Sequence, residues 1–581
     1  MAQKTYTGIG VSEGVRIAKA YVYLHPVIDT NKEIAPSEAD AEAARFQAAV
    51  KTALDEVDGL IVRSAEVLGK DKVGVLKGQK AILADPAYVP EIEKLIRKKN
   101  ASAEKAVKQI TDQFAAIFAA MSNAYMKERA ADVRDAGTRL LGILAGVKSG
   151  SLSEIDTEVI LISDDLSPSD TIQLNQKFVL GFATELGGKT AHTSIFAKSM
   201  GLPAVVGVPE LLGEVKDGDT VILDGAQGVC ILDPDEETVK TYQAKYKKEQ
   251  EQQAIFDTFS KKRAVMADGT RIVTAVNIGN AKDAEIGVAQ GAEAVGLMRT
   301  ELLFLSGDTA PTEEEQFQEY KKIAEALAGA EPGDVIIRTL DIGGDKEVKY
   351  LDIPKEENPF LGYRAIRLCL DRKDLFLTQL RALLRASAFG KLKIMFPMIS
   401  GYQEILDAKA VLAEAKAQLD VEQVAYDKDI QIGIMIEVPS AALLADVLAR
   451  EVDFFSIGTN DLVQYSLAVD RGNRKISYLY DYFNPAVIRL IGQVAKAAKP
   501  NNVLVGMCGG MAGDPLAVPL LVGLGLDELS MAAGAIPQSK YILSKVDLAT
   551  CQALAASVSD CKTPQEVRAI VTAFAEKHGL L

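Results

Sequence analysis

The C-terminal half of the chain repeats one pattern, a short apolar run followed by a stretch with helical spacing. Seven apolar runs are clear: RIVTAVNI, AVGLM, DVIIRTL, KLKIMFPM, IGIMIEV, DFFSIG and VLVGMC. They are continuous rather than alternating, which is typical of parallel strands buried on both faces. This alternation of strands and helices predicts an α/β fold, and a (β/α)8 barrel fits it best. We expect a weak eighth strand around Phe360 to Gly362, and a doubly wound sheet stays open as an alternative.

The N-terminal half changes in composition along its length. Residues 31–145 are rich in Ala, Glu, Lys and Leu, with apolar residues at helical spacing, whereas residues 1–30 and 146–234 are rich in Gly and Val. We therefore expect a compact α/β domain, formed by the two flanking stretches and interrupted by a helical subdomain at 31–145. A charged stretch without glycine, residues 235–262, predicts a solvated linker helix before a barrel domain at 263–581.

Composition excludes several classes of protein. The chain has 581 residues, and at roughly 150 per domain this makes room for three or four domains. With 48% hydrophobic and 25% charged residues it is neither disordered nor collagen-like. The formal charge of -15 argues against nucleic acid or an anionic membrane as the main partner.

The chain has no apolar run long enough for a membrane helix, and its N-terminus has no apolar core for a signal peptide. Its 5 cysteines show no CxxC pairing, so neither a disulfide framework nor a thiolate zinc site is indicated. We therefore expect a protein of the reducing cytoplasm.

Polar and charged residues stand where the apolar runs end. Barrel enzymes build their active sites at the carboxyl ends of the strands, so we expect these side chains to meet in one site. Any single pair could instead be a salt bridge that stabilises a loop, but the number of such residues at successive strand ends favours a site. They are Arg299, Arg338, Glu437, Asn460, Asp461 and Cys508.

The charges suit a small, multiply anionic ligand bound with a divalent cation. Glu437 and Asp461 supply hard oxygen ligands, but too few to fill a six-coordinate shell, which suits Mg2+ with waters and substrate oxygens. Guanidinium forks and an ammonium group suit phosphate and carboxylate oxygens. The candidates for that role are Arg299, Arg338, Arg471 and Lys346.

Two further residues could carry out proton or phosphoryl transfer. A free cysteine is usually an inert buried residue, but Cys508 ends what we expect to be the last strand, where a thiol could give a proton to a reacting carbon. His192 lies where two glycines run into a segment with helical spacing. The positive end of a helix dipole disfavours imidazolium and suits a phosphate on the ring, so His192 could be a nucleophile. A packing or capping role is the more common one for a lone histidine.

Several motifs occur in a fixed order: GGKTAHTS with GLPAVVG, GLMRTELLF, IRTLDIGGDK, NPFLGYRAIR, IMIEVPSAA, FFSIGTNDLVQYSLAVDRGN and GMCGGMAGD. By these motifs the chain resembles enzyme I of the bacterial phosphoenolpyruvate:sugar phosphotransferase system along essentially its whole length. The resemblance implies a cytoplasmic, Mg2+-dependent homodimer. Such an enzyme takes the phosphoryl group of phosphoenolpyruvate onto a histidine, releases pyruvate, and passes the phosphoryl group to the histidine phosphocarrier protein as the first step of sugar phosphotransfer.

The resemblance also implies a role for each matched residue. The carrier protein would bind the helical subdomain, the barrel would form the dimer, and the first domain would swing on the linker helix. The nucleophile would be His192 and the proton donor Cys508. The implied ligands are Arg299 and Arg338 for the phosphate, Glu437 and Asp461 for Mg2+, and Asn460, Asp461 and Arg471 for the rest of phosphoenolpyruvate.

Four positions differ from the pattern of that family. Gly510 stands where an acidic residue is usual, Asn484 where a histidine is common, and Ala191 where a serine is usual. Ser167 replaces a threonine but keeps a hydroxyl that could bond the imidazole. The glycine at 510 leaves open a regulatory, partner-binding protein with weakened or lost turnover. Dikinases, the nearest rival enzymes, need a nucleotide-binding domain for which this chain has no room.

Overall fold

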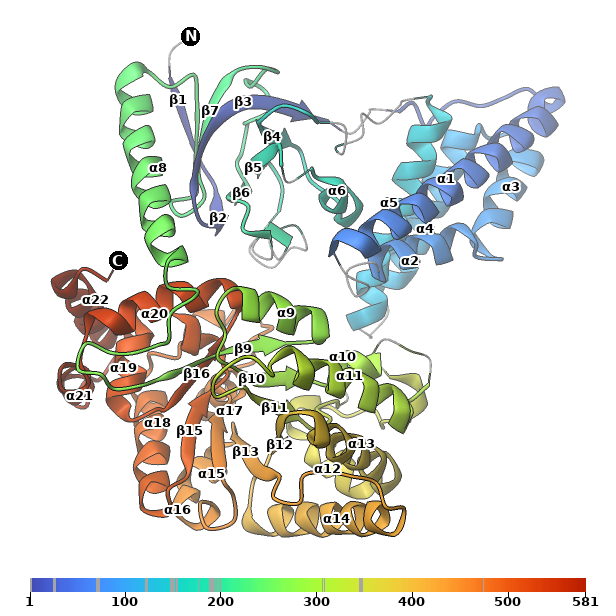
Figure 1. Cartoon of the computed structure of the whole chain (residues 1–581). Helices are drawn as coiled ribbons and strands as arrows, with labels where there is room; N and C mark the ends of the chain where they lie inside the picture. Colours follow the sequence, from blue (N-terminus) through green and yellow to red (C-terminus); the bar gives the residue numbers. More distant parts are fainter. Residues whose placement is uncertain are drawn as a thin grey trace. The chain divides into compact units, whose positions relative to one another are not determined.

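A computed structural model describes residues 3–24, 28–68, 74–120, 124–146, 155–175, 177–187, 200–305, 309–343, 348–473 and 475–580, and the single residues 152, 193, 196, 197 and 307. The chain divides into two compact units, Met1–Gln252 and Gln253–Leu581. The first contains a sheet and a group of helices, and the second contains a barrel (Figure 1).

An eight-stranded sheet forms the centre of the α/β part of the first unit, in the order β1-β8-β7-β3-β4-β5-β6-β2. Neighbours from β3 to β6 are parallel and the other pairs are antiparallel. Successive residues of β4 belong to separate apolar cores, Leu161 to one and Ile162 to the other, because they point to opposite faces. The strands are β1 (Lys4–Thr7), β2 (Ile9–Ser12), β3 (Val15–Tyr23), β4 (Val159–Ser163), β5 (Val179–Thr184), β6 (Ala204–Val206), β7 (Thr220–Asp224) and β8 (Val229–Leu232), and the short helix α6 is Pro168–Gln173.

Helices fill the part of the sequence where alanine-rich helical spacing predicts them. They enclose an apolar core of their own, in which the Tyr88 hydroxyl lies 2.7 Å from Thr111 Oγ1. Burying aromatic and aliphatic side chains on one face of each helix stabilises the group. The helices are α1 (Ala39–Leu68), α2 (Gly74–Leu83), α3 (Tyr88–Lys99), α4 (Ala103–Ala120) and α5 (Ala124–Leu144).

The charged helix α8 (Glu236–Asp257) leads from the last strand of the sheet to the second unit. An ion pair joins the middle of this helix to the sheet of the first unit, with Lys245 Nζ 2.6 Å from Asp224 Oδ2. Near its end, Phe256 packs on Tyr541 of the second unit with ring centroids 5.1 Å apart. The helix therefore begins in the first unit and ends in the second.

The second unit is a closed barrel of eight parallel strands. Seven of them are the predicted apolar runs, but the prediction for the eighth was wrong, because Pro359–Leu361 is a 3-10 helix. The Pro359 ring removes the N–H that a strand ladder needs. The eighth strand is β16, and its pairing with β9 closes the barrel and excludes a doubly wound sheet. Cys508 therefore follows the seventh strand, β15, and not, as predicted from the sequence, the last strand. The strands are β9 (Val273–Ile278), β10 (Ala294–Arg299), β11 (Asp334–Arg338), β12 (Lys391–Phe396), β13 (Gln431–Ile436), β14 (Phe454–Ile457), β15 (Leu504–Met507) and β16 (Glu528–Met531).

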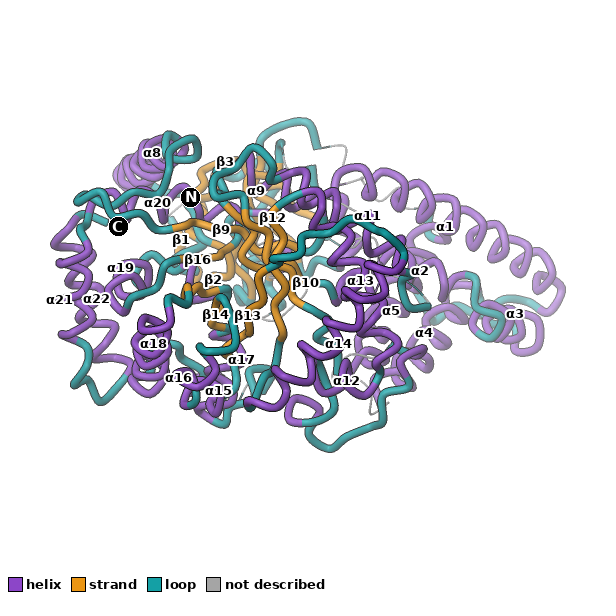
Figure 2. Tube along the Cα trace, turned by 60° about the horizontal axis from the view of Figure 1, so that its bottom comes forward, coloured by secondary structure: helices purple, strands orange, loops and turns teal. Residues whose placement is uncertain are grey.

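A cluster of apolar side chains lies inside the barrel. Helices cover the outside of the barrel (Figure 2). Phe454 and Met435 belong to the inner cluster, and Gly433 makes room for the ring, since a Cβ there would lie 2.4 Å from it. The helices are α9 (Ala281–Ala289), α10 (Glu301–Leu305), α11 (Glu313–Ala326), α12 (Ile366–Asp371), α13 (Lys373–Ala386), α14 (Tyr402–Val421), α15 (Pro439–Leu443), α16 (Ala445–Leu448), α17 (Thr459–Leu467), α18 (Pro485–Ala498), α19 (Ala517–Leu524), α20 (Ile536–Lys545), α21 (Leu548–Ser557) and α22 (Pro564–His578).

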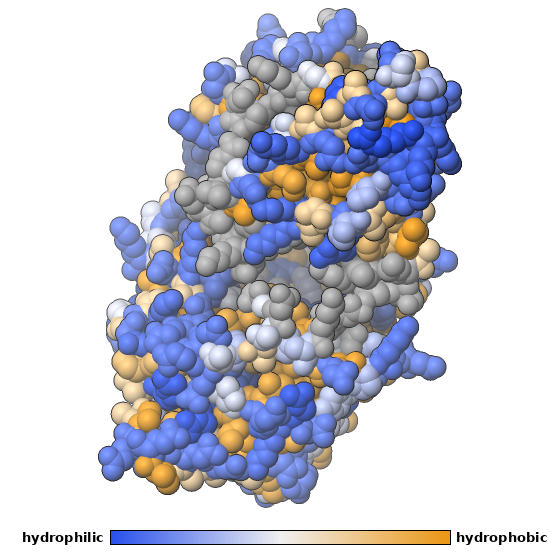
Figure 3. Space-filling view, turned by 90° about the vertical axis from the view of Figure 1, so that its right-hand side faces the viewer, coloured by the Kyte–Doolittle hydropathy of each residue, from blue (hydrophilic) through white to orange (hydrophobic). Residues whose placement is uncertain are grey.

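Hydrophilic side chains cover most of the face drawn in Figure 3. Among the described residues, no helix has the length and the apolar character needed to cross a membrane.

Candidate active site

Two arginines at the carboxyl end of the barrel share one carboxylate. Arg338, the last residue of β11, has its Nη1 2.8 Å from Asp341 Oδ2, and Arg364 Nη2 lies 2.8 Å from Asp341 Oδ1. All three side chains are buried. Burial opposes the charged form of Arg338, but the nearby carboxylates of Glu301 and Asp341 outweigh it, so the pKa of Arg338 is raised. Both guanidinium groups are therefore held charged and in fixed positions.

Among the residues that the structure describes, Arg338 also keeps a donor without a protein partner. Its Nη2 lies 2.7 Å from Glu301 Oε1, while its Nε is buried and makes no hydrogen bond. An unpaired buried donor is costly, and an anionic oxygen would satisfy it. The arrangement favours binding of a phosphate or carboxylate group.

Two acidic residues lie beside these arginines. Glu437, directly after β13, is buried, and its Oε1 accepts a hydrogen bond from Met398 N at 2.6 Å. Asp461, in the first turn of α17, has Oδ2 3.8 Å from Arg364 Nη2, and its buried Oδ1 accepts no hydrogen bond from the described part of the chain. Burial first and then the charge of Asp461 raise the pKa of Glu437. A cation that takes oxygen ligands fits this pair, because it would give Oδ1 of Asp461 a partner and offset the repulsion between the two carboxylates.

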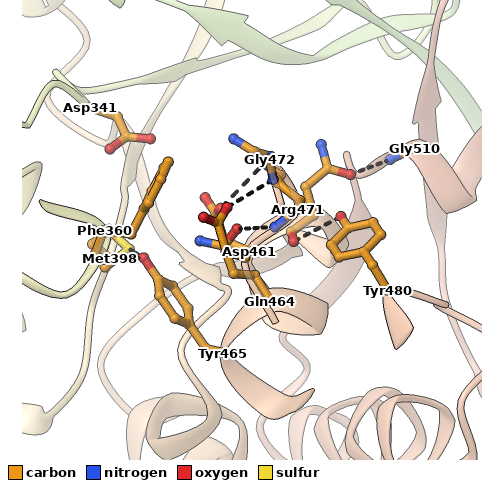
Figure 4. A network of polar contacts seen from close by, with 12 residues as sticks. Asp341, Phe360, Met398, Asp461, Gln464, Tyr465, Arg471, Gly472, Tyr480 and Gly510 are labelled. Atoms are coloured by element: carbon orange, nitrogen blue, oxygen red, sulfur yellow. Dashed lines mark hydrogen bonds and ion pairs between the residues drawn. The ribbon is translucent and has the colours of Figure 1, made fainter. Parts of the chain in front are cut away.

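Asn460 directly precedes Asp461 in the chain, and Arg471 lies beside Asp461 (Figure 4). Asn460 Oδ1 accepts a hydrogen bond from Gly510 N at 3.1 Å, and its carbonyl oxygen accepts one from Tyr480 at 3.0 Å. Arg471 Nη1 lies 3.9 Å from Asp461 Oδ1, and its side chain is 44% exposed. The asparagine is thus held in place, while the arginine is open to a ligand.

Cys508 follows β15 and packs into the apolar interior of the barrel, where it is 4% exposed. Burial raises the pKa of its thiol to about 11, so the group stays protonated at neutral pH. Its carbonyl oxygen accepts a hydrogen bond from Asn277 Nδ2 at 3.0 Å. A neutral, fixed thiol is suited to donating a proton.

Two glycines follow the thiol and differ in their surroundings. At Gly509 a Cβ would lie 1.7 Å from Thr459 Oγ1, so only glycine allows this close approach. At Gly510 the nearest atom to a Cβ would be Asn460 Oδ1, at the ordinary contact distance of 3.6 Å. The missing side chain at 510 is therefore not required by packing.

The other predicted residues are placed as follows. Arg299 is the exposed last residue of β10, at the same end of the barrel as Arg338. Ser167 caps α6, with its Oγ accepting from Asp170 N at 3.2 Å, and Asn484 caps α18 through Ala486 N at 3.0 Å. The described residues do not include Ala191, His192 or Lys346.

Comparison with known proteins gives family matches along the chain. Residues 252–548 match the family described as "PEP-utilising enzyme, PEP-binding domain". Residues 7–129 match "PEP-utilising enzyme, N-terminal", and residues 155–228 match "PEP-utilising enzyme, mobile domain". A phosphoenolpyruvate-protein phosphotransferase of Priestia megaterium is 47% identical over 94% of this chain and 95% of its own length. The chain belongs to the phosphoenolpyruvate-protein phosphotransferase family. Proteins of the same name from Staphylococcus carnosus (45% identical, 98% of this chain and 99% of theirs) and Bacillus subtilis (46%, 97% and 98%) are similar to it as well.

Among solved structures, Enzyme I (nEIt) is 36% identical over 42% of this chain and 99% of its own length, with a TM-score of 0.39. Membership of the phosphotransferase family confirms the predicted resemblance and the predicted class of reaction, phosphoryl transfer from phosphoenolpyruvate to a histidine. The mixed α/β fold with a barrel in its second half is confirmed too.

Sequence reasoning missed three charged residues of the site: Glu301, Asp341 and Arg364. Glu301 lies two residues beyond the end of β10, within GLMRTELLF, and Asp341 lies three residues beyond the end of β11, within IRTLDIGGDK. Their signal was the same as for the predicted residues, namely a charge next to a buried strand. Arg364 follows no strand directly and gave no such signal.

Proposed function

We propose that phosphoenolpyruvate binds at the carboxyl end of the barrel and that His192 accepts its phosphoryl group. The observation that supports this most strongly is the pair of buried guanidinium groups, Arg338 and Arg364, fixed on either side of Asp341. Phosphoryl transfer depends mainly on positioning and on stabilising charge, and rigid arginine forks supply both.

In this proposal the arginines divide the ligand between them. Arg299 and Arg338, with Lys346, hold the phosphate, and the buried donor Nε of Arg338 accounts for one phosphate oxygen. Asn460 and Arg471 bind the carboxylate end of phosphoenolpyruvate. The half-exposed side chain of Arg471 is suited to this, since it can close on a ligand.

Glu437 and Asp461 would hold Mg2+. Two adjacent carboxylates, one of them with a raised pKa and one with a buried oxygen that accepts no hydrogen bond from the described residues, fit a hard cation. Once bound, Mg2+ would neutralise charge on the transferring phosphoryl group.

Cys508 would donate its thiol proton to the methylene carbon of the enolate that remains when the phosphoryl group leaves, which yields pyruvate and leaves a thiolate. A general acid must carry its proton at the working pH, and burial keeps the Cys508 thiol neutral. The neutral imidazole of His192 would act as the nucleophile, with Ser167 as a candidate hydrogen-bond partner.

The two halves of the chain would have separate tasks. Residues 1–30 and 146–234 would form the phosphohistidine domain, and residues 31–145 would bind the histidine phosphocarrier protein. Residues 263–581 would bind phosphoenolpyruvate, and the helix within residues 235–262 would let the histidine serve both partners in turn.

We further propose a cytoplasmic homodimer that forms through the barrel. Several large apolar side chains of the barrel unit are exposed by 40% or more, and an interface between two barrels would cover some of them. They include Leu361, Leu443, Leu444, Tyr478 and Leu479. Analytical ultracentrifugation of the wild-type chain and of Leu443→Asp tests this. The wild type should sediment as a dimer, and the variant should dissociate to monomers at a higher protein concentration.

Mass spectrometry of the intact chain and its peptides, under conditions that spare acid-labile phosphohistidine, tests the proposal. After incubation with phosphoenolpyruvate and Mg2+ we expect one phosphate, on His192, which is absent when Mg2+ is chelated. His192→Ala should take no phosphate yet still bind phosphoenolpyruvate in calorimetry. Folded wild-type protein that takes no phosphate would contradict the proposal and favour the regulatory alternative that Gly510 suggests.

A further inference from the structure

A buried glutamine behind the site joins two of its main-chain segments. Gln379 lies on α13 and is 1% exposed. Its Oε1 accepts a hydrogen bond from Leu340 N at 2.9 Å, and its Nε2 donates one to Thr300 Oγ1 at 3.3 Å. One amide group therefore links the segment that follows β10 to the segment that follows β11.

These two segments carry the charged groups of the site. Thr300 lies between Arg299 and Glu301, and the other segment continues from Arg338 into Asp341. The Thr300 hydroxyl also donates to the carbonyl oxygen of Arg338 at 2.9 Å, so it bonds to both the strand end and the glutamine. A shift of the amide would move the arginines relative to each other.

The hydrogen bonds around Gln379 run in one consistent direction. The Thr300 hydroxyl donates its one hydrogen to the carbonyl oxygen of Arg338, so in its contact with Gln379 it must be the acceptor. Tyr320 donates to Gln316 Oε1 at 3.1 Å and accepts from Gln379 Nε2 at 3.3 Å, and Gln316 donates to Pro311 O at 3.0 Å. Both amide hydrogens and the amide oxygen of Gln379 are thus occupied, which fixes its orientation. A buried network with every member satisfied is rigid.

We propose that Gln379 is a positioning residue that sets the spacing of Arg299 and Arg338 for the phosphate of phosphoenolpyruvate. It does not touch the ligand but acts through Thr300 and Leu340. The inference rests on the ligand-binding role proposed above for the two arginines. Displacing a binding group by about 1 Å can cost on the order of 100-fold in rate, so a small loosening of this link would be measurable.

Gln379→Met in the full chain removes the amide while keeping a side chain of similar length. We expect the KM for phosphoenolpyruvate to rise about tenfold, with a smaller change in kcat. Gln316→Met is the matched control, because Gln316 is equally buried and belongs to the same network but contacts neither Thr300 nor Leu340. Its melting temperature should fall to a similar extent, while its KM stays within about twofold of wild type.

A second pair of variants covers the case in which Gln379→Met fails to fold. Thr300→Val removes the hydroxyl, whereas Thr300→Ser keeps the hydroxyl and removes only the methyl group. The inference predicts a raised KM in the first and a KM near that of wild type in the second. Equal KM values for Gln379→Met and Gln316→Met, or for the two Thr300 variants, would overturn it. A wild-type chain that neither binds phosphoenolpyruvate nor takes phosphate would overturn the proposed function instead.

Discussion

Asn277 donates its side-chain amide to the carbonyl oxygen of Cys508 at 3.0 Å, from the end of β9 to the residue after β15. The same amide donates to Ser530 O at 3.3 Å, and Asn277 Oδ1 accepts from Ser530 Oγ at 2.7 Å. One side chain thus ties together three strand ends next to the thiol. The position of the proposed proton donor depends on this asparagine.

Asn277→Ala should slow the release of pyruvate more than it weakens binding. We expect kcat to fall about tenfold and the KM for phosphoenolpyruvate to change little, since the variant displaces the thiol but leaves the arginines in place. Steady-state assays of pyruvate measure both. Ser530→Ala is the control, because it keeps the bond to Cys508 and should lose less activity. A higher KM with unchanged kcat would contradict the assignment.

The thiol of Cys508 should be slow to react at neutral pH. Because burial raises its pKa to about 11, the thiolate fraction is small and grows about tenfold per pH unit up to that value. Labelling with iodoacetamide, followed by peptide mass spectrometry, should therefore give a rate at Cys508 that still rises between pH 9 and pH 10. A plateau near the ordinary thiol pKa would contradict the burial argument, and Cys508→Ser identifies the peptide.

Asp341→Asn should destabilise the barrel unit strongly. The variant leaves Arg338 and Arg364 buried with a neutral partner between them, and removing one member of a buried ion pair costs on the order of 3–5 kcal/mol. Urea denaturation followed by circular dichroism measures this. Asp374→Asn breaks an exposed pair with Arg372 and should cost about 1 kcal/mol or less. Similar losses for the two variants would show that the buried charges are compensated in another way.

Gly510 should accept a side chain. Its Cβ would meet Asn460 Oδ1 at 3.6 Å and nothing nearer, so Gly510→Ala should fold as well as wild type. Gly510→Glu restores the acidic residue that the family pattern has beside the proton donor, and we expect kcat to rise roughly tenfold if that carboxylate assists proton transfer. Gly510→Gln, of the same shape but neutral, is the control. Equal kcat in the Glu and Gln variants would mean that charge at this position has no role.

The barrel could be predicted from the sequence because its strands are buried on both faces and read as continuous apolar runs. Strand β16 escaped this rule because it begins with Glu528, whose carboxylate lies inside the barrel. Gly296 and Gly506 leave space for it, and burial raises its pKa to about 7. Whether the interior of a barrel can accommodate a charged residue can be judged only from the neighbours of that residue in three dimensions.

The candidate site could be predicted in part for the same reason. Glu437 and Arg338 stand at strand ends, where a rule about barrels applies. Arg364 lies in the long connection between β11 and α12, and only folding brings it to Asp341. No local pattern encodes such a contact between a loop residue and a strand end.

The two glycines after Cys508 also bear on how this loop can change over generations. Thr459 fills the space beside Gly509, where any side chain would collide, whereas a Cβ at Gly510 would meet only Asn460 Oδ1, at the ordinary contact distance of 3.6 Å. Mutation can therefore alter the surroundings of the thiol at one codon and not at its neighbour. Of the two positions that follow the thiol, 510 is thus the one that can take a side chain without a steric clash.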